Sequence, residues 1–109
     1  MKGTNIGEFE ETVLLTVAVL FGDAYGFAIK NEIEKRSKRT ISIGAMRTTL
    51  ARLEEKGFLS SEFGEATNVR GGKRKRYFTV TRLGKLALEK VMKNRKELWE
   101  AIPKTAFNY

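Results

Sequence analysis

The sequence contains no cysteine and no histidine, and it has one aspartate and one proline among its 109 residues. Without cysteine there is no disulfide framework and no thiolate site, which is compatible with a reducing compartment, and we expect a cytoplasmic protein. Without histidine there is no Ser-His-Asp or Cys-His triad, no histidine general base and none of the usual zinc sites. We therefore expect no enzyme, no metal and no cofactor.

Long apolar runs are missing as well. The longest, over residues 13–21, is interrupted by Thr16 and is far shorter than the ~20 residues that cross a bilayer. Glu8, Glu10 and Glu11 precede it, where a signal peptide would carry Lys or Arg. The sequence thus predicts no membrane partner and no signal peptide, and its length predicts one domain with its own hydrophobic core.

Positive charge is plentiful and unevenly placed. Lys and Arg number 21 against 13 acidic residues, which gives a net charge of +8. Residues 1–25 carry a net charge of −3, so the whole excess lies in the later three quarters of the chain. A small basic domain is a candidate for binding nucleic acid.

Apolar residues at helical spacing predict a first helix over about residues 6–21, ended by Gly22. Because this helix is apolar on nearly all sides, either a second subunit covers one side or the helix is central within the monomer. Asp23 is predicted to cap a second helix over about residues 24–37.

A third helix is predicted from the cap Ser42 to about Lys56, and it ends at Gly57. One side of it carries Met46, Leu50 and Leu53, which we expect to be buried. The opposite side is polar, basic and built from small residues, and it consists of Arg47, Thr48, Ala51, Arg52 and Glu55.

The pattern then changes to two short strands, over residues 58–63 and 76–80. The segment between them is rich in glycine and predicts a hairpin with a long basic tip, whose cations are Arg70, Lys73, Arg74, Lys75 and Arg76. Thr81 can cap a last helix over about residues 82–102, which Pro103 ends. Such a helix is ~30 Å long, more than a small domain covers, which again suggests a partner chain.

Helix, helix, helix, basic hairpin and helix is the order of a winged helix-turn-helix, mainly α with a small β-hairpin and an added C-terminal helix. The polar side of the third helix suits the major groove, where Arg pairs with guanine and a Thr methyl can meet a thymine methyl. The hairpin cations suit the phosphate backbone. The candidate contacts to duplex DNA are Ser42, Arg47, Thr48, Ala51 and Arg52 on the helix and Arg70, Lys73, Arg74, Lys75 and Arg76 on the hairpin.

Four segments, IGEFEETVLL (6–15), DAYGFAI (23–29), SIGAMRTTLARLEEKG (42–57) and GKRKRYFTVTRLG (72–84), closely resemble the PadR-like transcriptional regulators. The resemblance implies a homodimeric bacterial or archaeal regulator, usually a repressor, whose hairpin is the wing and whose last helix serves dimerisation. Family members commonly have an aromatic residue followed by Pro or Thr after the position of Met46, where this chain has Arg47, Thr48 and Thr49. We therefore assign base readout to Arg47, with a phosphate contact or a plain surface charge as the alternatives.

In this interpretation residues 1–81 bind a pseudo-palindromic operator and residues 82–109 dimerise, the two forming one compact unit. The predicted dimer interface is apolar and comprises Phe9, Val13, Val17, Leu83, Leu86, Val91 and Leu98. Trp99 either anchors that interface or contacts a planar hydrophobic effector between the subunits. The competing interpretation is a basic helical module that binds RNA or an acidic protein.

Overall fold

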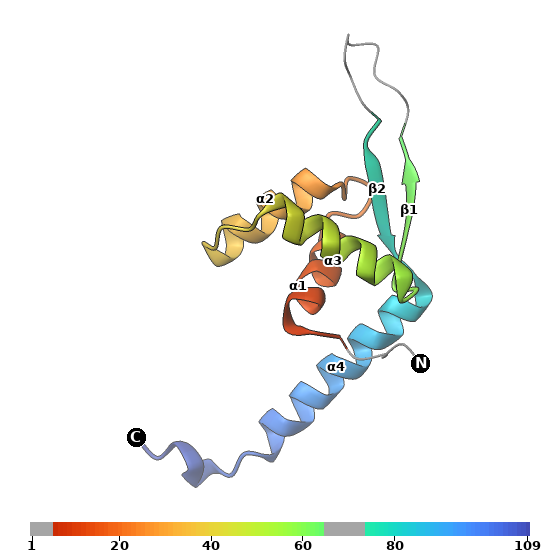
Figure 1. The fold of residues 1–109 in the computed structure, drawn as a ribbon. Coiled ribbons are helices and arrows are strands. Elements are labelled where there is room, and N and C mark those ends of the chain that lie inside the picture. The colour runs from red at the N-terminus through yellow and green to blue at the C-terminus, as the bar shows by residue number, and fades with distance from the viewer. Residues whose placement is uncertain (1–5, 65–73) are drawn as a thin grey trace.

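Four helices and a two-stranded hairpin make up the protein in the computed structural model, which describes residues 6–64 and 74–109 (Figure 1). The elements follow the chain in the order α1 (Glu8–Val19), α2 (Gly26–Ser37), α3 (Ile43–Glu55), β1 (Leu59–Phe63), β2 (Arg76–Val80) and α4 (Arg82–Ala101), and a 3-10 helix spans Lys104–Phe107. The strands are antiparallel, with Leu59 opposite Val80. The predicted fold class, a winged helix-turn-helix with an added C-terminal helix, is confirmed.

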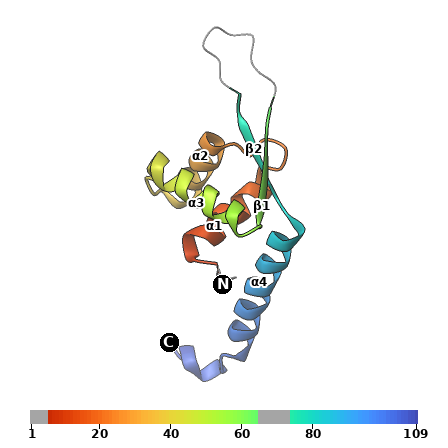
Figure 2. The ribbon, with the colours of Figure 1, turned by 45° about the vertical axis from the view of Figure 1, so that its right-hand side comes forward.

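The core lies where α1, α2 and α3 meet, and the hairpin lies along one side of it (Figures 1 and 2). Val13 and Val17 on α1 are only 0% and 1% exposed, because α2, α3 and β2 all pack around this helix. The prediction that a second subunit contacts Val13 and Val17 is therefore wrong, since a single chain already buries both. Phe9 is half-buried against the same core, whereas Leu15 and Val19 on α1 remain exposed.

The connection from α1 to α2 differs from the predicted one. The helix α1 ends at Val19 with Leu20 as its C-cap, slightly earlier than predicted, and Gly22 lies in the turn that follows, with a φ of +87° that an L side chain rarely adopts. Asp23 does not cap α2, because the chain stays extended for two more residues and the helix begins after Tyr25. In that extension the Ala24 carbonyl accepts a hydrogen bond from the Phe78 N–H at 2.8 Å, and Tyr25 forms a bridge with Tyr77 of β2. The hairpin thus holds the start of α2.

The start of α4 is built against the end of α3. The Thr81 hydroxyl accepts a hydrogen bond from the Gly84 N–H at 3.0 Å, as predicted for the cap, and donates one to the Gly57 carbonyl at 2.6 Å. Gly84 is buried so closely that an added Cβ would lie 2.3 Å from the Phe58 carbonyl oxygen. The direction in which α4 leaves the domain therefore depends on a glycine at this position.

Gly84→Ala is expected to destabilise the fold by about 1–3 kcal/mol, because the methyl group overlaps a backbone atom that cannot rotate away. Gly44→Ala is the matched control, since a Cβ there meets nothing within 4 Å and alanine favours the helix. Urea unfolding of the two variants checks the difference. Equal stability of the two would contradict the packing described for Gly84.

Candidate nucleic-acid interface

The outer side of α3 is polar and exposed, as its sequence predicts. Arg47, Thr48, Ala51 and Arg52 are all exposed, while Met46, Leu50 and Leu53 are buried against the core. The Ser42 hydroxyl caps the helix by accepting a hydrogen bond from the Ala45 N–H at 3.0 Å. The predicted helix side is therefore present, with its residues on one accessible surface.

Ion pairs and hydrogen bonds hold both ends of α3. Just before the helix, the Glu34 carboxylate accepts a hydrogen bond from the Ile41 N–H at 2.7 Å, and this bond, aided by Lys30, lowers the pKa of Glu34. After its last turn, the Lys56 ammonium lies 2.9 Å from the Glu10 carboxylate of α1. Burial alone raises the pKa of Glu10, but the Gly7 N–H and Lys56 outweigh it, so that pKa is lowered. Both carboxylates are thus charged at neutral pH and fix α3 on the domain.

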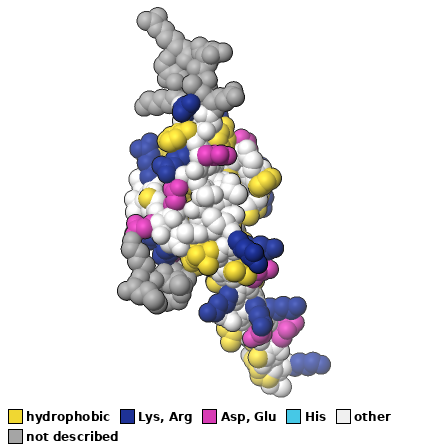
Figure 3. Space-filling model, turned by 90° about the vertical axis from the view of Figure 1, so that its right-hand side faces the viewer, with side chains coloured by type: hydrophobic (Ala, Val, Ile, Leu, Met, Phe, Trp, Pro, Cys, Tyr) yellow, Lys and Arg dark blue, Asp and Glu magenta, His cyan; other side chains and the backbone are white. Residues whose placement is uncertain are grey.

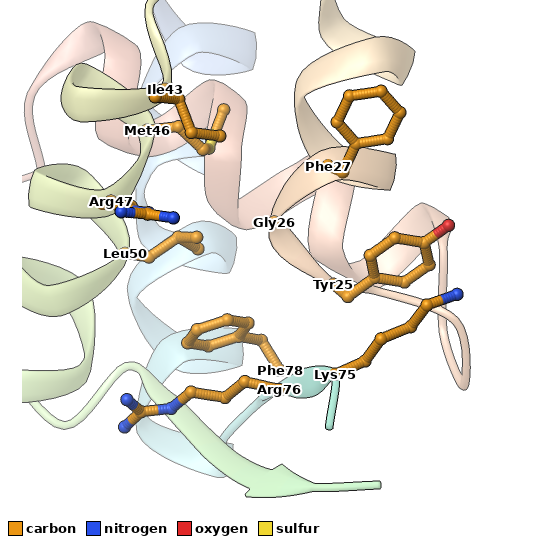
Figure 4. Close-up of a pocket in the computed structure, with 10 residues that line it drawn as sticks. All are labelled: Tyr25, Gly26, Phe27, Ile43, Met46, Arg47, Leu50, Lys75, Arg76 and Phe78. Carbon is orange, nitrogen blue, oxygen red and sulfur yellow. The ribbon is translucent and has the colours of Figure 1, made fainter. Parts of the chain in front are cut away.

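A groove of about 550 Å³ runs between α3, the start of α2 and the start of β2 (Figure 4). Met46, Leu50 and Phe78 give it an apolar floor. Arg47 extends from α3 into this groove and makes no ion pair or hydrogen bond with any other residue that the structure describes. The guanidinium proposed to read a base is therefore available to a ligand.

Lys75 lies on the opposite side of the groove, directly before β2 at the loop end of the hairpin strands. Its ammonium is 4.2 Å from the centre of the Tyr25 ring, and this ring meets the Tyr77 ring edge-on at 5.8 Å. Arg74, the residue before it, is exposed. Arg70 and Lys73, the other predicted cations of the hairpin tip, lie outside the described residues. Lys75 therefore lines the same groove as Arg47, and Arg74 is accessible beside it in the chain.

Arg76 has a different environment from the one predicted. Its guanidinium pairs with Glu54 of α3 at 2.9 Å and donates a hydrogen bond to the Ser61 hydroxyl of β1 at 2.8 Å. The Ser61 hydroxyl in turn donates to Glu54. Because its charge is already paired, Arg76 braces the hairpin against α3 instead of extending a free cation from it.

A second surface lies on α4, which projects away from the core (Figures 1 and 2). Gly84 and Leu88 face the core and are buried, and Val91 is half-buried in line with them. Farther along, Leu98 and Trp99 are 70% and 71% exposed, and with Arg95 and Ile102 they line a shallow hollow. Exposed hydrophobic side chains lie among Lys and Arg along this helix (Figure 3). The apolar stripe of α4, which begins with the buried Leu88 and continues to Leu98, thus extends beyond the surface that one chain covers.

An ion pair joins this helix to the core. The Arg95 guanidinium lies 3.0 Å from the Glu11 carboxylate of α1, which is buried. Two of the predicted interface residues, Leu83 and Leu86, are exposed near the start of α4. The α4 residues predicted to meet a partner are therefore at least partly accessible, in contrast to Val13 and Val17.

Comparison with known proteins assigns this fold. Residues 14–90 match the transcriptional regulator PadR-like family. This chain belongs to that family. A protein from Lysinibacillus sphaericus, described as uncharacterized, is 34% identical over 86 residues, which cover 77% of this chain and 76% of its own length.

Solved structures of PadR-like proteins share this fold. A PadR-like transcription factor from Bacteroides fragilis is 27% identical, with a TM-score of 0.70 and 84% of each chain covered. A PadR family regulator from Clostridium difficile is 26% identical, with a TM-score of 0.65, covering 83% of this chain and 91% of its own. The family and its structures are transcription regulators rather than enzymes, and membership implies DNA-binding regulation.

Two kinds of feature are absent from residues 6–64 and 74–109, the part of this PadR-like protein that the structure describes. No helix there is long and apolar enough to span a bilayer. No cluster of three His, Cys, Asp or Glu side chains there could hold a metal ion.

Sequence reasoning missed two features of the interface. The first is the pairing of Arg76 with Glu54, which are 22 residues apart and come together only through the hairpin. The second is that Phe27 and Ile43 are exposed in the groove, 59% and 45% respectively. Ile43 directly follows the cap Ser42, which was a usable signal, since the first residues of such a helix are the ones that reach DNA bases.

Proposed function

We propose that this PadR-like protein is a sequence-specific repressor that binds duplex DNA as a homodimer. The observation that carries the proposal is the exposed side of α3, where Arg47 has no ion pair among the described residues and lies across a groove from Lys75 of the hairpin. This arrangement suits insertion of α3 into the major groove while the hairpin contacts the adjacent backbone. Chromosomal DNA as the target agrees with the cytoplasmic location that we expect from the sequence.

The side chains divide into three roles. Arg47 pairs with a guanine, and Thr48 and Ala51 lie against neighbouring base edges. Ser42, Arg52, Arg74 and Lys75 contact phosphates, together with Arg70 and Lys73, which are outside the described residues. Arg76 acts indirectly, by holding the hairpin against α3. The stretch 1–81 thus forms the DNA-binding part, and 82–109 the dimerisation part.

The dimer forms through α4, where a second copy covers the exposed stripe that contains Leu98 and Trp99. Leu83, Leu86 and Val91 of α4, and Phe9, Leu15 and Val19 of α1, are further apolar side chains that are at least partly accessible and are proposed to join this interface. Two symmetric α3 helices require a pseudo-palindromic site, with half-site centres about 34–36 Å or a multiple apart.

A planar hydrophobic effector is proposed to bind beside Trp99, in the hollow with Leu98 and Ile102, and to release the DNA. It must favour the non-binding arrangement by up to ~5.5 kcal/mol for a near-complete switch. Titration with flat aromatic dyes is expected to change the fluorescence of Trp99, the only tryptophan, while DNA affinity falls in parallel. Changed fluorescence with constant DNA affinity would show a pocket without a switch.

The experiment that tests the function compares three ligands at matched salt: a duplex selected from a random library, a scrambled duplex and a structured RNA. The proposal predicts binding to the selected duplex at least 10³-fold tighter than to the others. Equal affinity for RNA and DNA would favour the basic module that binds RNA or acidic proteins.

A further inference from the structure

Two exposed apolar side chains on the DNA-facing side have no role in the function proposed above. Phe27, in the first turn of α2, and Ile43, the first residue of α3, are 59% and 45% exposed, and both line the groove that contains Arg47 (Figure 4). Neither belongs to α1 or α4, so the proposed dimer surface does not cover them. We call these two side chains the apolar edge.

The apolar edge lies among cations. Arg47 and Lys75 line the same groove. A surface of this charge favours a polyanion as the partner, and an apolar protein segment would leave these cations without counter-charges. The occupant that suits both the cations and the apolar edge is a duplex whose major groove carries apolar groups.

Ile43 is four residues before Arg47, so both lie on one side of α3, about 6 Å apart along the axis. Successive base pairs are about 3.4 Å apart. If Arg47 contacts one base pair, Ile43 reaches a position about two base pairs away. The spacing therefore places the apolar edge against a base edge of the same half-site.

Isoleucine has no group that can form a hydrogen bond with a base. A donor or acceptor on a base edge pressed against it would lose water without gaining a partner. In the major groove the apolar group offered by the bases is the C5-methyl of thymine. We infer that Ile43, flanked by Phe27, selects a thymine in each half-site through this methyl group. This inference rests on the proposed function.

The test removes the apolar group on the DNA side of the contact and then the one on the protein side. In the duplex selected by the full-length protein, each thymine of both half-sites is replaced in turn by deoxyuridine, which lacks only the C5-methyl. The guanine that Arg47 contacts is the one whose replacement lowers the affinity as much as Arg47→Ala does. Replacing the thymine about two base pairs from that guanine is expected to lower the affinity about fourfold per half-site. With both half-sites changed the loss is about 15-fold.

The same series is then measured with Ile43→Ala, which is expected to bind deoxyuridine and thymine at that position equally well. Ile43→Val, which keeps a branched side chain, retains the preference. Thr48→Ala is the comparison variant, because Thr48 is another exposed residue of α3 with a methyl group; it lowers the affinity for the operator through its own base contact but leaves the ratio of the affinities for thymine and deoxyuridine at this position unchanged. Because Ile43 is exposed, none of these variants removes a core residue.

A loss on deoxyuridine that is the same in the wild type and in Ile43→Ala would overturn the inference, as would no loss at any thymine. Equal weakening of all duplexes by Ile43→Ala would also overturn it, since this would place Ile43 against deoxyribose. In each of these cases the duplex is still bound and the proposed function stands. Failure of the selection to enrich any duplex would instead refute the proposed function.

Discussion

Leu98→Asp is expected to separate the dimer into monomers and to lower the affinity for a complete operator by about 10²–10⁴-fold. The side chain is 70% exposed in one chain, in line with the buried stripe of α4, so the proposed partner would bury a charge there. A monomer engages one half-site and loses the gain that comes from linking two contacts. Analytical ultracentrifugation and binding to the full and half operators measure the two effects.

Lys93→Gln is the control for this variant. It also changes the net charge by one unit in the negative direction and lies on α4, but its side chain is largely exposed and lies on a different side of the helix. It should remain dimeric and bind both duplexes nearly as the wild type does. A wild-type protein that sediments as a stable folded monomer at micromolar concentration would contradict the proposed dimer.

Arg47→Ala is expected to cost ~1–3 kcal/mol per half-site on the operator and little on random DNA, because a bidentate pair with guanine is lost. Arg74→Ala combined with Lys75→Ala should instead weaken binding to all duplexes alike. That double variant should also reduce the dependence of log K on log salt by about 1 for each phosphate contact removed. Fluorescence anisotropy over a range of salt concentrations measures both effects.

Arg47→Lys sharpens this comparison, since it keeps the charge and removes the bidentate geometry. It should lose most of the preference for the operator while keeping the salt dependence of the wild type. If Arg47→Ala weakens operator and random DNA equally, Arg47 contacts the backbone and does not read a base.

The elements of this fold could be predicted because their signals are local. Ser42 and Thr81 each cap the helix that follows them, as the sequence indicated, and each accepts the expected backbone hydrogen bond. The period of buried residues in α3 separated Met46 and Leu50 from the polar side that carries Arg47. Helix periodicity, caps and glycine positions therefore located the helix now proposed to bind DNA.

The errors came from contacts between distant segments. Whether the nearly all-apolar α1 faced a second subunit or its own domain depended on how tightly α2, α3 and β2 surround Val13 and Val17. The start of α2 depended on pairing between Tyr25 and Tyr77, which delays the helix beyond Asp23. The role of Arg76 depended on Glu54. No local pattern carries this information, because each outcome is decided by contacts with other elements of the fold.

The most direct test of the central claim, that two α3 helices of a dimer read a duplex, is selection of binding sites from a random duplex library followed by footprinting. The account predicts an enriched pseudo-palindrome with two protected half-sites whose centres are one helical turn, or a multiple of it, apart. A single unrepeated protected site, or no enrichment over the starting library, would contradict it.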